Sequence, residues 1–259
     1  MKLSKILALL MMASLVAVAG CGSSDDDDDI SAGGSKGGST AAAPAAALGT
    51  ASISGKVTLT GKAPIAAKIA FDADPVCKSQ HTGTANDETV VSDAKGNLAN
   101  VFVYVKDAPN TAAPSTPVVL TQHGCMYSPH VFGIQVNQTM QIVNDDQTLH
   151  NIHCLAAVND SFNVGQPTQG MKTEKKFGKA EVLVPFKCDV HGWMHCFGGV
   201  VNNSFFSVSG ADGGFKITQL PAGSYTLVAV HEKYGVSEEK KVTVTDGASQ
   251  TVDFTFAAK

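Results

Sequence analysis

The feature that most restricts the fold is a series of short hydrophobic runs that extends from Thr50 to the C-terminus. Runs such as NVFVYVKD at 100–107 and FKITQL at 215–220 alternate apolar and polar residues, and clusters of Gly, Pro, Asn and Asp separate them. No window of twelve or more residues carries a 3.6-residue period, so amphipathic helices are not expected. The sequence therefore predicts an all-β protein made of two antiparallel β-sandwiches.

The first twenty residues have the organisation of an export signal. Two lysines precede apolar and small residues at 6–20, a stretch shorter than a typical membrane span. The residues VAGC, ending at Cys21, resemble the lipobox of bacterial lipoproteins, in which the cysteine becomes lipidated. We therefore expect a lipoprotein signal peptide at 1–20 and lipid anchoring to a membrane of a bacterial cell envelope, facing the periplasm or cell exterior. An ordinary cleaved signal peptide and an uncleaved anchor are the alternatives.

Residues 21–50 offer little material for a hydrophobic core. Gly, Ser and Ala dominate this segment, and five consecutive aspartates occupy positions 25–29. Such a composition is typical of a solvated linker, so we predict a disordered tether. We interpret the aspartates as a solvated charge run, with calcium binding or a sorting signal as the alternatives.

The charge pattern argues against a nucleic-acid partner. The formal net charge is −4, and the chain contains no arginine, the residue best suited to bidentate contacts with phosphates and bases. The pattern G-x-x-x-x-G-K-S/T is absent from the sequence, and G-x-S-x-G occurs only as GGSKG at 33–37, inside a Gly/Ser-rich stretch that lacks the pattern of a strand-to-helix turn. We therefore expect neither nucleotide hydrolysis nor serine-hydrolase chemistry.

The C-terminal region has recognisable turn motifs. ADGGF at 211–215 and LPAGSY at 220–225 resemble the carboxypeptidase regulatory-like domain, a small transthyretin-like sandwich. Such domains usually open with a G-x-V strand. The C-terminal region has no such strand before these motifs, but SISGKVTLTGKAP at 52–64 resembles one. We therefore expect a discontinuous sandwich of residues 51–113 and 202–259, with a second domain inserted at 114–201. Two sequential domains are the simpler alternative.

One nine-residue stretch gathers unusually soft side chains. CDVHGWMHC at 188–196 contains Cys188, His191 and Met194, which are donors that a copper ion can take from a single loop. Upstream, His150 precedes Asn151 in the stretch LHNIH. Together these stretches resemble the cupredoxins, in which a histidine of an H-N-V type stretch precedes a C-x-x-H-x(n)-M loop. The whole layout is also similar to that of bacterial exported proteins that join a cupredoxin-like, Greek-key domain to a carboxypeptidase regulatory-like domain.

The resemblance implies one type 1 copper ion per chain, held by His150, Cys188, His191 and Met194. It implies that Asn151 bridges to the ligand loop by hydrogen bonding, and that the edge of His191 faces solvent as the entry point for electrons. The site could alternatively take His195 in place of Met194, or Cys154 or Cys196 as a further ligand. Zinc accepts the same thiolate and imidazoles as copper.

Several neighbouring residues receive other assignments. On a strand, residues three apart face opposite ways, so we expect His153 to point away from His150 and Cys154 to share its side. Trp193 could dock a partner or simply pack. Three further histidines are interpreted as ordinary surface or core residues: His81, His123 and His130.

Cysteine counting suggests two disulfides. If Cys21 carries lipid and Cys188 carries metal, four of the six cysteines remain, and an exported protein lies in a compartment that permits disulfides. Three pairings are possible. We favour Cys77 with Cys125 and Cys154 with Cys196, because the second pair would brace the two segments of the metal site.

The expected function is electron transfer without catalysis. The tether would let a type 1 copper domain carry single electrons between exported redox partners, such as a cytochrome c or a copper enzyme. The chain lacks the H-x-H pairs of a multicopper oxidase, and we expect a monomer. The alternatives are a copper protein for storage, delivery or sensing, and a metal-free accessory or adhesion protein.

Overall fold

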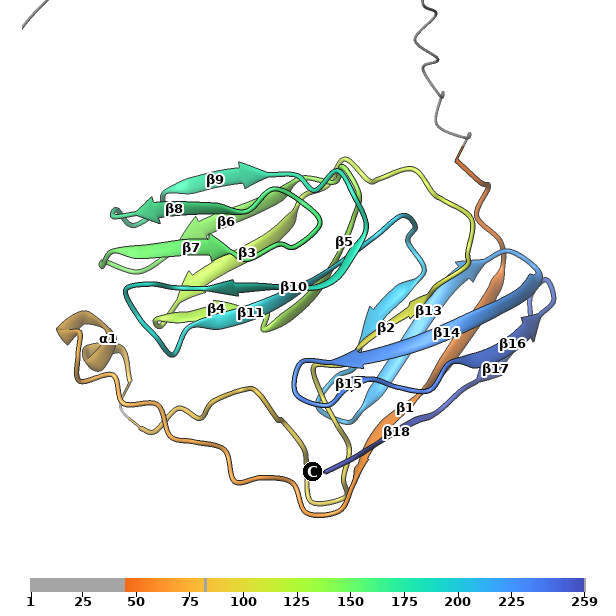
Figure 1. Cartoon of the computed structure of the whole chain (residues 1–259), viewed down its shortest axis with the longest axis horizontal. Helices are drawn as coiled ribbons and strands as arrows, with labels where there is room; N and C mark the ends of the chain where they lie inside the picture. Colours follow the sequence, from red (N-terminus) through yellow and green to blue (C-terminus); the bar gives the residue numbers. More distant parts are fainter. Residues whose placement is uncertain (1–44, 82, 259) are drawn as a thin grey trace, which may run out of the picture. The chain divides into compact units, whose positions relative to one another are not determined.

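The computed structural model describes residues 45–81 and 83–258 (Figure 1). The expected signal peptide, Cys21 and the tether as far as residue 44 lie outside the described residues. The described part contains eighteen strands and one short helix, so the all-β prediction is confirmed. Among the described helices, none has the length and hydropathy of a membrane span.

Two of the four sheets share one hydrophobic core and form a sandwich that we call sandwich A. One sheet has the order β13-β1-β17, with β18 also on β1, and the other has the order β12-β2-β14-β15, with β16 on β14. The buried side chains of Ile53, Val103 and Leu227 come from both sheets and meet in this core. The strands are β1 (Ala51–Thr60), β2 (Phe102–Val105), β12 (Phe206–Val208), β13 (Gly214–Leu220), β14 (Gly223–His231), β15 (Gly235–Val236), β16 (Lys240–Val244), β17 (Ser249–Thr251) and β18 (Phe254–Ala257).

The other two sheets form sandwich B. Their strand orders are β5-β11-β10-β7-β8 and β4-β3-β6-β9. Phe186 is 1% exposed and packs against other aromatic rings in the core, and burial of such a side chain contributes about 1.5–3 kcal/mol. The strands are β3 (Val118–His123), β4 (Met126–Ser128), β5 (Val131–Gln135), β6 (Met140–Asn144), β7 (His150–Cys154), β8 (Phe162–Gln166), β9 (Lys172–Lys175), β10 (Glu181–Lys187) and β11 (His195–Val201).

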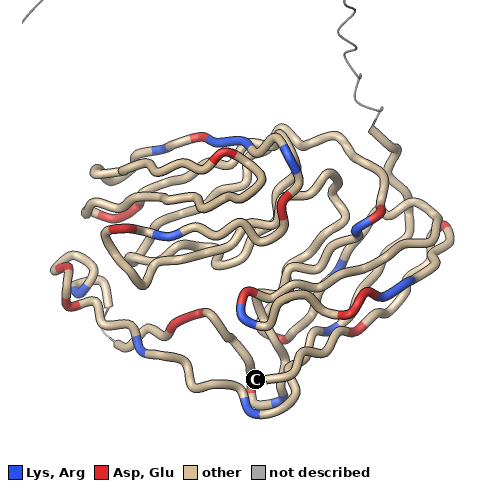
Figure 2. The backbone as a smooth tube through the Cα atoms, viewed as in Figure 1, with Lys and Arg blue, Asp and Glu red and all other residues tan. Residues whose placement is uncertain are grey.

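Sandwich A takes strands from both sides of sandwich B in the chain. β1 pairs antiparallel with β13 and parallel with β17 and β18, and β2 pairs with β12 and β14. Lys and Asp/Glu residues are distributed along both sandwiches (Figure 2).

The two sandwiches approach closely where aromatic rings of sandwich A face glycines of sandwich B. A Cβ atom added at Gly133 would lie 2.1 Å from the Phe206 ring, and one at Gly199 would lie 2.4 Å from the Phe102 ring. Any larger residue at these positions would collide with a ring. Glycine on neighbouring strands β5 and β11 therefore permits this packing.

A long segment between β1 and β2 leaves sandwich A and reaches sandwich B. It contains the helix α1 (Pro75–Gln80), whose N-cap residue Asp74 accepts hydrogen bonds from the backbone N–H groups of Val76 (2.7 Å) and Cys77 (3.2 Å). Cys77 forms a disulfide with Cys125, one of the two expected pairs. We call residues 71–81 the cover segment.

The second expected disulfide, Cys154 with Cys196, is wrong, because both thiols are free and buried. Cys154 on β7 and Cys196 on β11 both lie opposite Phe186 of β10, one on each side. Two strand spacings separate their Cα atoms by roughly 9.5 Å, beyond the reach of a disulfide. An intervening strand therefore keeps these thiols apart.

Candidate metal centre

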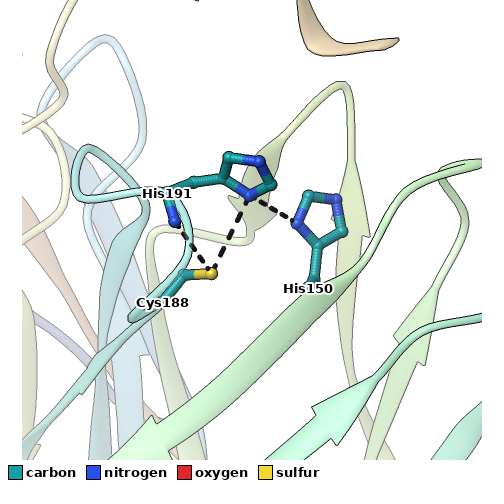
Figure 3. A group of neighbouring side chains, drawn as sticks. All are labelled: His150, Cys188 and His191. Carbon is teal, nitrogen blue, oxygen red and sulfur yellow. Dashed lines mark hydrogen bonds between the residues drawn. The ribbon is translucent and has the colours of Figure 1, made fainter. Parts of the chain in front are cut away.

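Three of the four predicted ligands converge at one end of sandwich B (Figure 3). The Nδ1 atoms of His150 and His191 are 3.0 Å apart, and His191 Nδ1 is 3.9 Å from Cys188 Sγ. All three side chains are buried, with 0–2% of their surface exposed. The site therefore consists of one thiol and two imidazoles that are shielded from solvent.

Neighbouring strand ends bring these residues together. His150 begins β7, and Cys188 directly follows β10, which pairs with β7. The loop after Cys188 turns back tightly, because the Cys188 N–H donates to the Met194 carbonyl (3.0 Å) and the Met194 N–H donates to the His191 carbonyl (2.9 Å). The His191 N–H donates to Cys188 Sγ at 3.3 Å. Backbone hydrogen bonds therefore fix the loop geometry.

Asn151 joins the ligand loop to β7. Its Oδ1 accepts a hydrogen bond from the Asp189 N–H (2.6 Å) and lies 3.2 Å from Cys188 Sγ. Its Nδ2 donates to Asn163 Oδ1 at 2.6 Å. These contacts hold the loop against the strand that carries His150.

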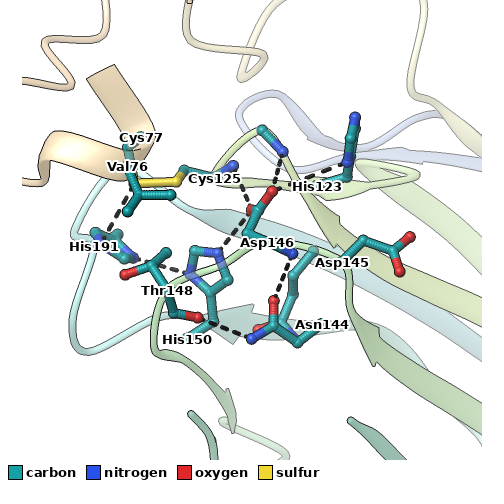
Figure 4. Close-up of polar contacts among 12 residues, drawn as sticks. Val76, Cys77, His123, Cys125, Asn144, Asp145, Asp146, Thr148, His150 and His191 are labelled. Atoms are coloured by element: carbon teal, nitrogen blue, oxygen red, sulfur yellow. Dashed lines mark hydrogen bonds and ion pairs between the residues drawn. A yellow bond between two sulfur atoms is a disulfide. The ribbon is translucent and has the colours of Figure 1, made fainter. Parts of the chain in front are cut away.

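Two carboxylates orient the imidazoles from outside. His150 Nε2 is 2.8 Å from Asp146 Oδ2 (Figure 4), and His191 Nε2 is 3.1 Å from an oxygen of Asp74. A carboxylate only accepts, so each Nε2 carries a proton, and each ring, when neutral, directs the Nδ1 lone pair inward. Burial would raise the pKa of Asp146, but hydrogen bonds from His150 and from the Cys125 and Gly124 N–H groups lower it to about 2.

This donor set fits a metal ion. The three ligand atoms lie within 4.8 Å of one another, near twice a metal–ligand bond of about 2.0–2.3 Å. Two inward lone pairs only 3.0 Å apart repel each other unless a proton or a cation lies between them. The residues present therefore suit a soft or borderline cation.

Met194 and His195 have different surroundings. Met194 is fully buried and belongs to the same hydrophobic cluster as Cys188. His195 lies outside the three-residue group, and its Nε2 is 3.8 Å from Glu232 and 3.9 Å from Asp87. His195 therefore does not belong to the group of His150, Cys188 and His191.

The expected exposure of His191 is wrong. The side chain is 2% exposed, because the cover segment places Asp74 and Cys77 Sγ (3.6 Å) against its outer nitrogen. Trp193 packs at right angles to Phe71 of this segment and donates its Nε1–H to the Cys125 carbonyl (2.9 Å). Trp193 therefore has a packing role under the cover segment.

The remaining histidines are placed separately. His153 lies on β7 outside the ligand group, and its Nδ1 is 3.0 Å from Asp189. His81 stacks on Phe71 and donates its Nε2–H to the Gly124 carbonyl (2.7 Å), and the side chain of His123 is exposed. His130 is buried in a second group of polar side chains.

Sequence reasoning missed Asp74 and Asp146 as partners of the ligands. Asp146 precedes His150 by four residues in NDDQTLH, which is a local signal that could have been used. Asp74 has no such signal, because 117 residues separate it from His191.

The acidity of Cys188 gives a prediction for the metal-free protein. Burial would raise the pKa of this thiol, but hydrogen bonds with His150 and His191 lower it to about 6. We expect ultraviolet thiolate absorbance to appear with a midpoint near pH 6, and to be missing in Cys188→Ser.

The same shift links pH to stability. Because the folded-state pKa is below the unfolded value of about 8.5, this group stabilises the metal-free fold fully above that value. Its contribution is lost as the pH falls through 6. A thiol that titrates near pH 8.5 in the folded chain would contradict the prediction.

Asp146→Asn should weaken metal binding about 10–100-fold, the usual effect of losing the outer partner of a ligating histidine. The amide can donate as well as accept, so it no longer fixes the tautomer of His150. Competition for Cu(I) with a chromophoric chelator measures the change. Asp145→Asn is the control, because Asp145 is an exposed neighbour, and equal affinities of the two variants would refute the role of Asp146.

Comparisons with known proteins match one region of the chain to a family and find solved structures that are similar over part of the chain. Residues 200–257 match the carboxypeptidase regulatory-like domain family, and no curated protein matches the chain. A copper-containing nitrite reductase from Thermus scotoductus SA-01 is similar, with a TM-score of 0.32, 21% identity, and coverage of 35% of this chain and 23% of the reductase.

Two smaller proteins are also similar. A purple cupredoxin from Nitrosopumilus maritimus gives a TM-score of 0.28 and 22% identity over 32% of this chain and 98% of its own. A Cu(I) amicyanin variant gives a TM-score of 0.29 and 17% identity over 38% of this chain and 97% of its own.

Proposed function

We propose that this chain is a membrane-tethered type 1 copper protein that carries single electrons between exported redox partners. The observation that carries the proposal is the buried group of His150, Cys188 and His191, closed by a loop that ends in buried Met194. Two imidazoles, a thiolate and a thioether are the donors of a blue-copper site. Copper, when bound, would supply a one-electron couple there.

The protein would contribute a rigid environment to this site. Asp146 and Asp74 hold both imidazole rings, and Asn151 holds the ligand loop against β7. Burial excludes water from the three ligands. Ligands that are held in place before the electron arrives need little rearrangement, and small rearrangement favours fast electron transfer.

The proposed setting is the bacterial cell envelope, with lipid on Cys21 and a tether that allows the domain to reach a cytochrome c or a copper enzyme. The buried His191 makes direct contact of its ring with such a partner impossible without movement of the cover segment. An electron would therefore pass through the cover segment or through another face of the loop.

Storage or delivery of copper is the second candidate function, and the same cover segment bears on it. Asp74 accepts a hydrogen bond from His191 Nε2, and the Cys77–Cys125 disulfide anchors this segment over the site. Exchange of a metal ion would require the segment to open. We therefore expect slow exchange, which suits an electron carrier or a store better than a rapid donor.

Copper titration of the full chain tests the proposal. We expect an intense visible thiolate-to-copper band that saturates at one copper ion per chain, bleaches on reduction and returns on oxidation by a cytochrome c without loss of copper. A colourless copper complex would contradict a type 1 site. Loss of copper to a weak chelator within one redox cycle would support delivery instead.

A further inference from the structure

A second group of metal-binding side chains lies where sandwiches A and B meet. The ligand atoms of His130, His195 and Glu232 lie within 4.8 Å of one another. His130 immediately precedes β5 and His195 begins β11, and these two strands pair in parallel. Glu232 follows β14 of sandwich A. Two histidines of one sandwich thus face a carboxylate of the other.

Both histidines direct a nitrogen atom toward the same carboxylate. His130 Nε2 contacts Glu232 Oε1, and His195 Nε2 lies 3.8 Å from Glu232 Oε2. The outer nitrogen of His195 donates to the Trp193 carbonyl (3.1 Å), so a neutral ring carries its lone pair on Nε2. The Thr89 hydroxyl lies 3.4 Å from His195 Nε2 and is a distant donor to the lone pair on that atom.

His130 has a buried nitrogen without a hydrogen-bond partner among the described residues. Its side chain is 2% exposed, and Nδ1 lies 3.8 Å from a carboxylate oxygen of Glu88. That distance is too long for a hydrogen bond. When Nε2 is bound to a cation, the proton of the neutral ring lies on Nδ1 and faces this carboxylate, which is where outer carboxylates stand around metal-bound histidines.

Negative charge accumulates around these two rings. Glu88 faces His130, Asp87 Oδ2 lies 3.9 Å from His195 Nε2, and the side chain of Glu232 is only 7% exposed. Loss of hydration is costly for a buried carboxylate, and Glu232 offsets it through the contact of Oε1 with His130 Nε2. A cation between the two Nε2 atoms and Glu232 would neutralise this charge and engage both histidines at once.

We propose that His130, His195 and Glu232 bind a divalent metal ion of the Zn²⁺ type, which links sandwich A to sandwich B. Two histidines and one glutamate are an established zinc-binding set that leaves a position open. The group contains no thiolate, so a copper ion bound there would give no intense visible band. The inference does not depend on copper at the first centre.

Zinc binding by the full chain tests the site, with the first centre disabled by His150→Gln and Cys188→Ser. We expect equilibrium dialysis and elemental analysis to find one Zn²⁺ per chain in this double variant. Addition of Glu232→Gln should weaken zinc binding more than about 100-fold. This exceeds the loss of about 10–100-fold that is usual when a residue hydrogen-bonded to a metal ligand is removed. The matched control is Glu238→Gln, an exposed glutamate close by in the sequence, which should keep the zinc.

Two results would overturn the proposal: absence of zinc from the double variant, or equal zinc affinity in the Glu232→Gln and Glu238→Gln proteins. Thermal melting shows whether each variant is folded. Zinc should raise the Tm of the double variant and leave the Tm of the triple variant that also carries Glu232→Gln unchanged. In the otherwise unaltered chain, Glu232→Gln should retain the visible copper band. That band reports only the first centre, so the two proposals fail or succeed separately.

Discussion

Cys188→Ser is expected to abolish the visible thiolate-to-copper band and to weaken Cu(I) binding more than about 100-fold, beyond the loss caused by removal of an outer partner. The thiolate is the one anionic soft donor of the group, and its pKa of about 6 keeps it ionised at neutral pH. A serine hydroxyl stays protonated and is a poor ligand for Cu(I). Absorption spectra and competition with a Cu(I) chelator measure both effects.

Cys154→Ser is the matched control for this experiment. Cys154 is also a buried free thiol of sandwich B, but it lies at the other end of β7 from His150 and outside the ligand group. The control should retain the band and the affinity. A band that survives in Cys188→Ser would mean that another residue supplies the colour, and the proposed ligand set would be wrong.

Removal of the Cys77–Cys125 disulfide by Cys77→Ala and Cys125→Ala should lower the free energy of unfolding by about 4 kcal/mol. The bridge spans 48 residues, and the chain-entropy relation gives this value for a loop of that length. Urea denaturation followed by circular dichroism measures the loss. Cys154→Ala serves as the control, because it removes a buried sulfur without removing a crosslink.

The same double variant should change the metal site. Without the disulfide the cover segment is held mainly by the contacts of Asp74 with His191 and Thr148 and by the packing of Phe71. We therefore expect faster loss of copper to a chelator than from the parent chain. A loss of stability below about 1 kcal/mol with unchanged exchange would show that the crosslink does not hold the segment in place.

Local patterns in the sequence were sufficient for the class of fold and for the ligand loop. Period-two alternation places one face of each strand in a core, which is why the strands could be predicted without knowledge of their partners. Cys188, His191 and Met194 lie within seven residues, so one turn brings their backbones together. His150 came from the resemblance to a family, since 38 positions separate it from Cys188.

Contacts between distant segments could not be read in the same way. Asp74 contacts His191 from a cover segment that a disulfide joins to sandwich B, and this contact buries a ring that was expected to face solvent. The position of β10 between β7 and β11 separates Cys154 from Cys196. Sheet order is a global property, and spacing along the chain does not encode it.

The sequence by itself determined the all-β class, the soft donors of one loop and the Asn beside the first histidine, because each depends on neighbouring residues. Only the tertiary structure decided which groups surround those donors. It directed His195 toward Glu232 of the other sandwich and placed the cover segment over His191. The physical reason is that burial and charge pairing depend on long-range packing of sheets, whereas strand and turn formation depend on local side chains.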